Sequence, residues 1–252
     1  VRALAVDAEA ALLEYLAMFY NLGFAGRTLR RMGAIEFATT LAPGLRDVLL
    51  TGKVKECVNR SANGRHVYDA VVLDAPPTGR VVKFLDVTRA MADLAKVGPI
   101  RGQSEGVVRL LHSADTAVHL VTVQEEMPVR ETLDAVAELD HADLRPGAVF
   151  VNRVQPARLP TRSVTAAADG RVDASRINAG LGTAGLKLAS ETLDGLVAET
   201  VEHAVRVAAE QRARGQLSET DLPVLDLPQI TDGIDTAALY ELAETLTANG
   251  VH

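Results

Sequence analysis

Asp74 is a single carboxylate placed between a short apolar run and a pair of prolines. The run Ala70–Leu73 predicts a strand buried on both faces of a parallel sheet. The prolines stop the backbone from continuing as strand or helix, and Thr78-Gly79 then precede a helical pattern. A carboxylate between a strand end and a helix N-terminus is typical of a Mg²⁺–nucleotide site. The alternative is a solvated Asp that caps the strand end, with the prolines only shaping a loop.

A second residue with useful chemistry, Asn152, closes another predicted strand, Ala148–Val151. Its side-chain amide offers both a donor and an acceptor, and Arg153 follows it directly. The alternative is a loop asparagine that bonds its own backbone. Glu125 lies just beyond a third predicted strand, 116–123, and on its own it reads as a solvated loop charge.

Alternating helices and strands must position these residues. Helical patterns cover 8–20, with Asp7 as N-cap, and then 27–40, 43–60, 81–96, 105–112, 130–140, 192–214 and 235–248. A fourth strand is expected at 223–227, and the stretch 156–189 reads as loops and short helices. The alternation predicts an α/β fold with a doubly wound, mainly parallel sheet. We expect one domain over 1–252, with a helical subdomain inserted at approximately 8–60 and 85–113.

Composition excludes several classes of function. The net charge of −7, the 4% aromatic content and the absence of Trp argue against nucleic-acid binding. The sequence has neither a secretory signal pattern nor an apolar run long enough to span a bilayer, so a cytoplasmic protein is expected. Cys57, the single cysteine, excludes an intrachain disulfide. The six histidines show no metal-ligand pairing, and His119 reads as a hydrogen-bonded core residue.

The segment around Asp74 resembles the switch II motif, Asp-Thr-Ala-Pro-Thr-Gly-His, of the arsenite-pump and tail-anchored-protein-targeting ATPases. The chain keeps Asp74 and Pro77-Thr78-Gly79 but has Ala75, Pro76 and Arg80 where the family usually has Thr, Ala and His. The chain is most similar to the actinobacterial branch named for anion transport. Other segments that resemble the family, in the same order, are Pro43-Gly44, Glu125–Pro128 with Glu131-Thr132, Val149–Arg153, and Leu227-Pro228 with Asp232-Gly233.

This resemblance implies a P-loop NTPase-like fold, with ATP and Mg²⁺ as cofactors. Asp74 would hold a Mg²⁺-bound water, and the backbone around Thr78-Gly79 would sense the γ-phosphate. Adenine would be held by Asn152, Arg153 and Pro228.

The resemblance also implies partners. Glu125 aligns with the family's Glu that reaches across a dimer toward the partner's nucleotide. A homodimer, or a heterodimer with a paralogous ATPase, is therefore implied. One cysteine can build neither the metalloid-binding cysteine cluster of arsenite pumps nor the zinc-binding Cys-x-x-Cys of eukaryotic targeting factors. An apolar helix stripe within 12–22 suggests either packing between helices or a groove for a hydrophobic or membrane-protein client.

One departure from the family is large. The nearest approach to its P-loop is Gly52-Lys53, which is followed by Val54 rather than Ser or Thr. The family's switch I has no counterpart either. The chain thus resembles a member that lacks its first strands, P-loop and switch I, and a first residue other than Met favours a fragment, although a natural paralogue without a P-loop stays open. We expect an ATPase when intact and no activity from these residues alone. The alternatives are a non-hydrolysing subunit paired with an active paralogue, and a chaperone-like binder of hydrophobic segments.

Overall fold

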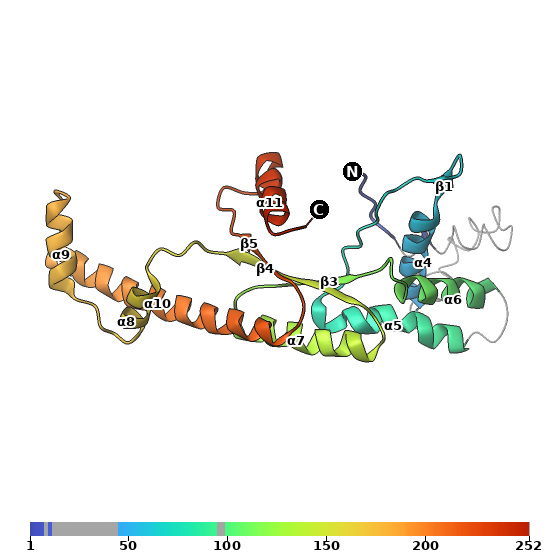
Figure 1. Ribbon diagram of the computed structural model, residues 1–252, viewed down its shortest axis with the longest axis horizontal. Coiled ribbons are helices and arrows are strands. Elements are labelled where there is room, and N and C mark those ends of the chain that lie inside the picture. Colours follow the sequence, from blue (N-terminus) through green and yellow to red (C-terminus); the bar gives the residue numbers. More distant parts are fainter. Residues whose placement is uncertain (8–9, 12–44, 95–98, 252) are drawn as a thin grey trace, which may run out of the picture. The chain divides into compact units, whose positions relative to one another are not determined.

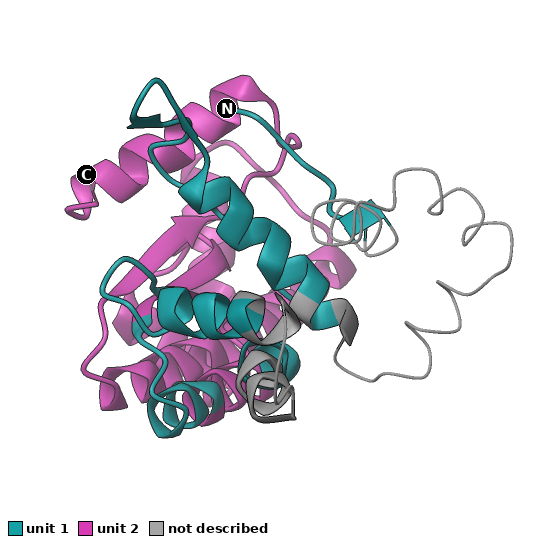
Figure 2. Cartoon of the chain, turned by 90° about the vertical axis from the view of Figure 1, so that its right-hand side faces the viewer, with its two compact units in different colours: residues 1–118, 135–146 teal, residues 119–134, 147–252 magenta. Residues whose placement is uncertain are grey.

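The computed structural model describes residues 1–7, 10–11, 45–94 and 99–251 (Figure 1). They fall into two compact units, residues 1–118 with 135–146 and residues 119–134 with 147–252 (Figure 2). The predicted helix 27–40 and the apolar stripe at 12–22 lie outside the described residues. The side chain of Asp7 accepts a hydrogen bond from the Ala10 N–H at 2.8 Å, which confirms the predicted N-cap. The predicted bounds of the domain and of its helical insertions stay a prediction.

Three helices make the core of the first unit. They are α4 (Leu45–Asn59), α5 (Thr78–Leu94) and α6 (Pro99–Leu111), and each packs against the other two. Their buried apolar side chains include Leu49, Val81, Phe84, Leu85 and Val107. All three were predicted from the sequence. Pro99 occupies the first turn of α6, where its missing N–H costs no hydrogen bond.

A small hairpin follows α4. Strands β1 (Ser61–Ala62) and β2 (Arg65–His66) pair antiparallel around Asn63-Gly64. Both turn residues have positive φ, 52° and 77°, which is the conformation that two-residue hairpin turns favour. Asn-Gly is also the residue pair that such turns prefer.

The prediction of a buried strand at Ala70–Leu73 is wrong. Residues 70–75 form no regular secondary structure, and the side chain of Val72 is 94% exposed. A strand exists only where a neighbour completes its backbone hydrogen bonds, and no described strand pairs with this run. Apolar composition alone was therefore an insufficient signal, and Asp74 follows an extended, exposed segment.

The second unit contains a three-stranded sheet. Strands β3 (Val118–Thr122), β4 (Pro146–Val154) and β5 (Val224–Pro228) lie in the order β3-β4-β5, and β4 runs parallel to β5 with Val149 opposite Val224. In the sequence, α7 (Glu126–His141) connects β3 to β4, as a crossover between parallel strands requires. The predicted α/β class with a mainly parallel sheet is confirmed.

The remaining helices of this unit lie between β4 and the C-terminus. They are α8 (Thr161–Ala168), α9 (Ala174–Thr183), α10 (Ser190–Gln216), the short 3₁₀ helix η1 (Leu217–Glu219) and α11 (Thr236–Ala248). α8 packs on α10 through Val164, Ala167 and Ala204, and α11 contacts β5. Asp173 and Asp235 cap α9 and α11 by accepting backbone N–H bonds. Among the described residues, no helix combines the length and the apolar character needed to cross a membrane.

Candidate functional site

The carboxyl ends of β4 and β5 bring three of the predicted site residues together. The strands keep register up to Val151 and Asp226, then shift, and pair again at Val154 and Pro228. Arg153 lies in this irregularity with a φ of 59°, as the extra residue of a β-bulge does. Beyond it, the Gln229 N–H donates to the Val154 carbonyl at 2.9 Å. Asn152, Arg153 and Pro228 therefore share one edge of the sheet.

The side chain of Asn152 is half-buried, and one of its two polar atoms is hydrogen-bonded within the chain. Its Oδ1 accepts a hydrogen bond from the Arg153 N–H at 2.9 Å, which is the local backbone bond that the sequence left open as an alternative. Its Nδ2 has no acceptor within the described part of the chain, so the amide keeps a free donor. A free N–H donor matches the ring-nitrogen acceptors of adenine. The adenine role of this residue stays a prediction.

Asp74, Thr78 and Gly79 lie in the first unit, at the N-terminus of α5. The Asp74 carboxylate is exposed, and no residue in the ranges 45–94 and 99–251 forms a hydrogen bond or an ion pair with it. The Arg80 N–H donates to the Pro77 carbonyl at 2.8 Å, whereas the N–H groups of Thr78 and Gly79 have no acceptor in the same ranges. Gly79 is exposed, and a Cβ at its position would meet no atom of the rest of the chain within 4 Å.

This donor set fits Mg²⁺ only if a nucleotide accompanies the ion. No group of three or more His, Cys, Asp or Glu side chains that could hold a metal occurs in the described chain. Mg²⁺ keeps several waters and is usually bound by one or two carboxylates together with substrate phosphates. One exposed carboxylate, Asp74, beside free helix-N-terminal amides matches that mode of binding and does not match an all-protein metal cage.

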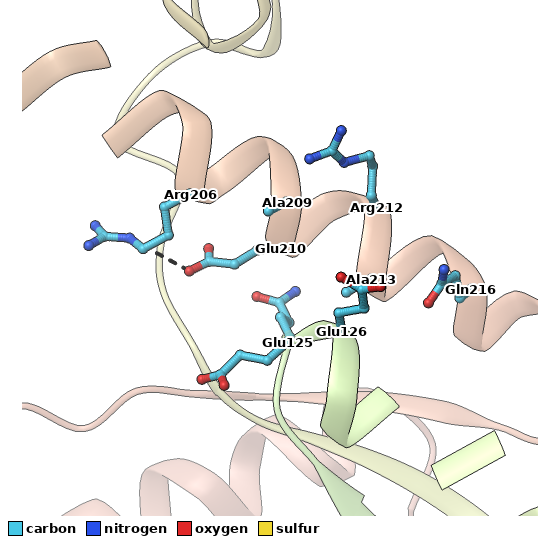
Figure 3. Close-up of a pocket in the computed structure, with 9 residues that line it drawn as sticks. Glu125, Glu126, Arg206, Ala209, Glu210, Arg212, Ala213 and Gln216 are labelled. Carbon is cyan, nitrogen blue, oxygen red and sulfur yellow. Dashed lines mark ion pairs between the residues drawn. The ribbon is translucent and has the colours of Figure 1, made fainter. Parts of the chain in front are cut away.

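Glu125 lines a polar groove of about 530 Å³ in the second unit (Figure 3). One wall is the loop that follows β3, and the other is the C-terminal half of α10, where Arg206 and Glu210 form an ion pair at 3.7 Å. Within the described residues no ion pair joins Glu125 to α10. The side chains that line the groove are Gln124, Glu125, Glu126, Arg206, Ala209, Glu210, Arg212, Ala213 and Gln216.

The predicted residues thus form two groups. Asn152, Arg153, Pro228 and Glu125 belong to one unit, and the segment from Asp74 to Gly79 belongs to the other. Sequence reasoning missed the α10 wall of the groove. An Arg–Glu pair at i,i+4 signals an exposed helix face, but nothing in the sequence tells which loop that face meets.

Comparisons with known proteins show that the chain is similar to ATPases. No family model matches the chain. Over all 252 residues it is 57% identical to ATPase BagA of Mycobacterium tuberculosis, covering 74% of that protein, and a Mycobacterium bovis protein named as an ATPase matches equally. An Aquifex aeolicus protein, whose name assigns it to the arsenical pump-driving ATPases, is 25% identical over 183 residues. That match covers 60% of the chain and 59% of the Aquifex protein.

Proposed function

Since the chain belongs to the ATPase family that includes BagA of Mycobacterium tuberculosis, we propose that it forms the adenine- and Mg²⁺-handling part of an enzyme that hydrolyses ATP. The observation that carries this proposal is the pairing of β4 with β5, which brings Asn152 and Pro228 together. In open α/β sheets, ligands bind at the carboxyl ends of parallel strands. The names of the relatives support ATP hydrolysis as the reaction, and the meeting of β4 and β5 supports this edge of the sheet as the adenine site.

Each residue then has a definite task. The free Nδ2 of Asn152 donates to a ring nitrogen of adenine, and Arg153 and Pro228 flank the base. By the resemblance at switch II, Asp74 would hold a water on Mg²⁺, and the N–H groups of Thr78 and Gly79 would donate to the γ-phosphate. Mg²⁺ bound with the nucleotide would supply positive charge that stabilises the phosphate oxygens. Release of the γ-phosphate would remove the acceptor of the α5 amides, so that segment would respond to hydrolysis.

Binding the β- and γ-phosphates of ATP for hydrolysis requires groups that these residues do not include. The 252 residues contain no Gly-x-x-x-x-Gly-Lys-[Ser/Thr] sequence, whose amides and lysine usually preorganise the β- and γ-phosphates. We therefore assign that part of the site to residues other than these, and we expect the 252 residues alone to show no Mg²⁺-dependent hydrolysis. The alternative from the same family is a non-hydrolysing subunit that pairs with an active paralogue. A chaperone-like role would need a hydrophobic client.

The proposal is tested by ADP binding to the intact protein, measured by calorimetry. Asn152→Ala should weaken binding by about tenfold, because one charge-free hydrogen bond and its packing are lost. Asn178→Ala, an exposed change on α9 of the same unit, is the control and should leave binding unchanged. Equal affinities for both variants would remove the adenine site, and an intact protein that binds ADP without turning over ATP would favour the non-hydrolysing subunit.

A further inference from the structure

Lys55, on α4, extends its side chain across α6 at Gly106. A Cβ on Gly106 would overlap the Lys55 Nζ and would lie 2.7 Å from its Cε. The glycine is buried and Lys55 is half-buried, so the absent side chain at position 106 makes the space that the ammonium occupies. This close approach fixes the lysine head group against the backbone of α6.

The charges around this ammonium are unbalanced. Burial lowers the pKa of Lys55, and the nearby positive charge of Arg109, one turn after Gly106 on α6, lowers it further. Two carboxylates lie beside these residues in the sequence. Glu56 accepts two hydrogen bonds from Arg60 and pairs with Lys53 at 3.1 Å, and Glu105, next to Gly106, also has an interaction partner. Within the described residues, no ion pair joins Lys55 or Arg109 to a carboxylate.

Half-buried cations in proteins are normally compensated by a partner. Here Lys55 is half-buried at the contact between α4 and α6, where Gly106 leaves room for its ammonium, and the positive charge nearest to it that lowers its pKa is that of the exposed Arg109. An oxyanion between them would accept from the ammonium and from the guanidinium, whose planar fork suits phosphate oxygens. It would replace the repulsion between the cations by two attractive contacts.

We infer that Lys55 and Arg109, at the contact between α4 and α6, bind a phosphate-type oxyanion. The site uses none of the residues proposed above for adenine or Mg²⁺, so it is independent of that function. Two sources share this chemistry: free inorganic phosphate, and the terminal phosphate of a nucleotide.

The test measures the Tm of the intact protein while sodium phosphate replaces sodium chloride at constant ionic strength, which separates specific binding from screening. Phosphate at ten times its dissociation constant should raise the Tm by about 3 °C. Lys55→Met and Arg109→Gln should each abolish that rise. Lys83→Met, an exposed change on α5 of the same unit, should keep it. An equal rise in all four proteins, or no rise in any, would overturn the inference.

A second measurement needs no variant. Acetic anhydride modifies lysines only as free amines, so bound phosphate should slow acetylation of Lys55 several-fold, read by peptide mass spectrometry, and leave Lys83 unaffected. Repeating it with ADP and with adenosine separates the sources. Protection by phosphate identifies the free ion, protection by ADP alone identifies a nucleotide phosphate, and protection by neither overturns the site.

Discussion

The ring Nδ1 of His119 on β3 accepts a hydrogen bond from the Ala148 N–H on β4 at 3.0 Å. The ring also meets Phe150 edge-on, with 5.6 Å between ring centroids. The sequence predicts a hydrogen-bonded histidine buried in this strand. The hydrogen bond is confirmed, but the burial is wrong, because His119 lies on an exposed position of β3. Gly147, beside Ala148, leaves the space that the ring fills.

That contact makes Gly147→Ala destabilising. A Cβ at position 147 would lie 2.6 Å from both the Cε1 and the Nδ1 of His119, so the ring must move and its hydrogen bond is lost. We expect a loss of about 1–3 kcal/mol in the free energy of unfolding, measured with urea. Gly195→Ala is the matched control within α10, where a Cβ meets nothing within 4 Å, and it should stabilise by about 0.5–1 kcal/mol. Equal urea midpoints for Gly147→Ala and the wild type would contradict the packing described.

Lys55 predicts a pH dependence with a definite sign. Burial and the charge of Arg109 lower the pKa of Lys55 in the folded state below the 10.5 of a free lysine. Between those two pKa values the unfolded chain binds the extra proton, so the native state gains stability as the pH rises. Lys55→Met removes the cost of the buried charge. It should be more stable than the wild type at pH 7, without phosphate, and this advantage should shrink toward pH 10.5. A difference that does not change with pH, measured by urea unfolding, would contradict the shift.

Arg214 on α10 and Asp226 on β5 form the ion pair that joins this helix to the sheet, at 2.9 Å. Their side chains are 28% and 46% exposed, so water screens the attraction. A double-mutant cycle with Arg214→Gln and Asp226→Asn should give a coupling energy below about 1 kcal/mol. A coupling of several kcal/mol would show that this pair, rather than apolar packing, holds the helix on the sheet.

Asp74→Asn tests the metal role in the intact protein. The change keeps the shape but removes the charge that orients the water on Mg²⁺, so ATP hydrolysis should fall at least tenfold. The Tm without nucleotide should change little, because the carboxylate is exposed. Asp69→Asn, another exposed aspartate in the same segment, is the control. Unchanged turnover at saturating Mg²⁺–ATP would return Asp74 to a solvated surface carboxylate.

Glu125→Ala tests the proposed dimer. If Glu125 reaches the nucleotide of a partner, the variant should weaken association that depends on Mg²⁺–ATP and leave folding intact. Sedimentation of the intact protein, alone and mixed with a paralogue, measures this with and without nucleotide. Glu199→Ala, exposed on α10, should behave as the wild type. Monomers under all of these conditions would remove the role of Glu125 between subunits.

Local signals in the sequence were enough to predict the positions of most helices. Capping residues such as Asp235, and apolar residues at helical spacing, locate α4, α10 and α11 within a few residues of their observed ends. These signals act within one element. The strand predicted at Ala70–Leu73 failed because a strand depends on neighbouring strands, which its own sequence does not specify. The groove shows the same limit: Glu125 and Arg206 are 81 positions apart in the chain, and only the fold places them on facing walls.

The length of α10 has a mechanical consequence. Its last turns form a wall of the groove that Glu125 lines, and its 27 residues run about 40 Å to Ser190, near which α9 packs. A continuous helix is stiff, so a tilt at its C-terminal end, near the Arg214–Asp226 pair, is carried along α10 together with α8, which packs on it. A tilt of about 5° at the groove would carry the α9 end through about 3 Å. A small adjustment beside the sheet would thereby become a displacement of several ångströms at α9.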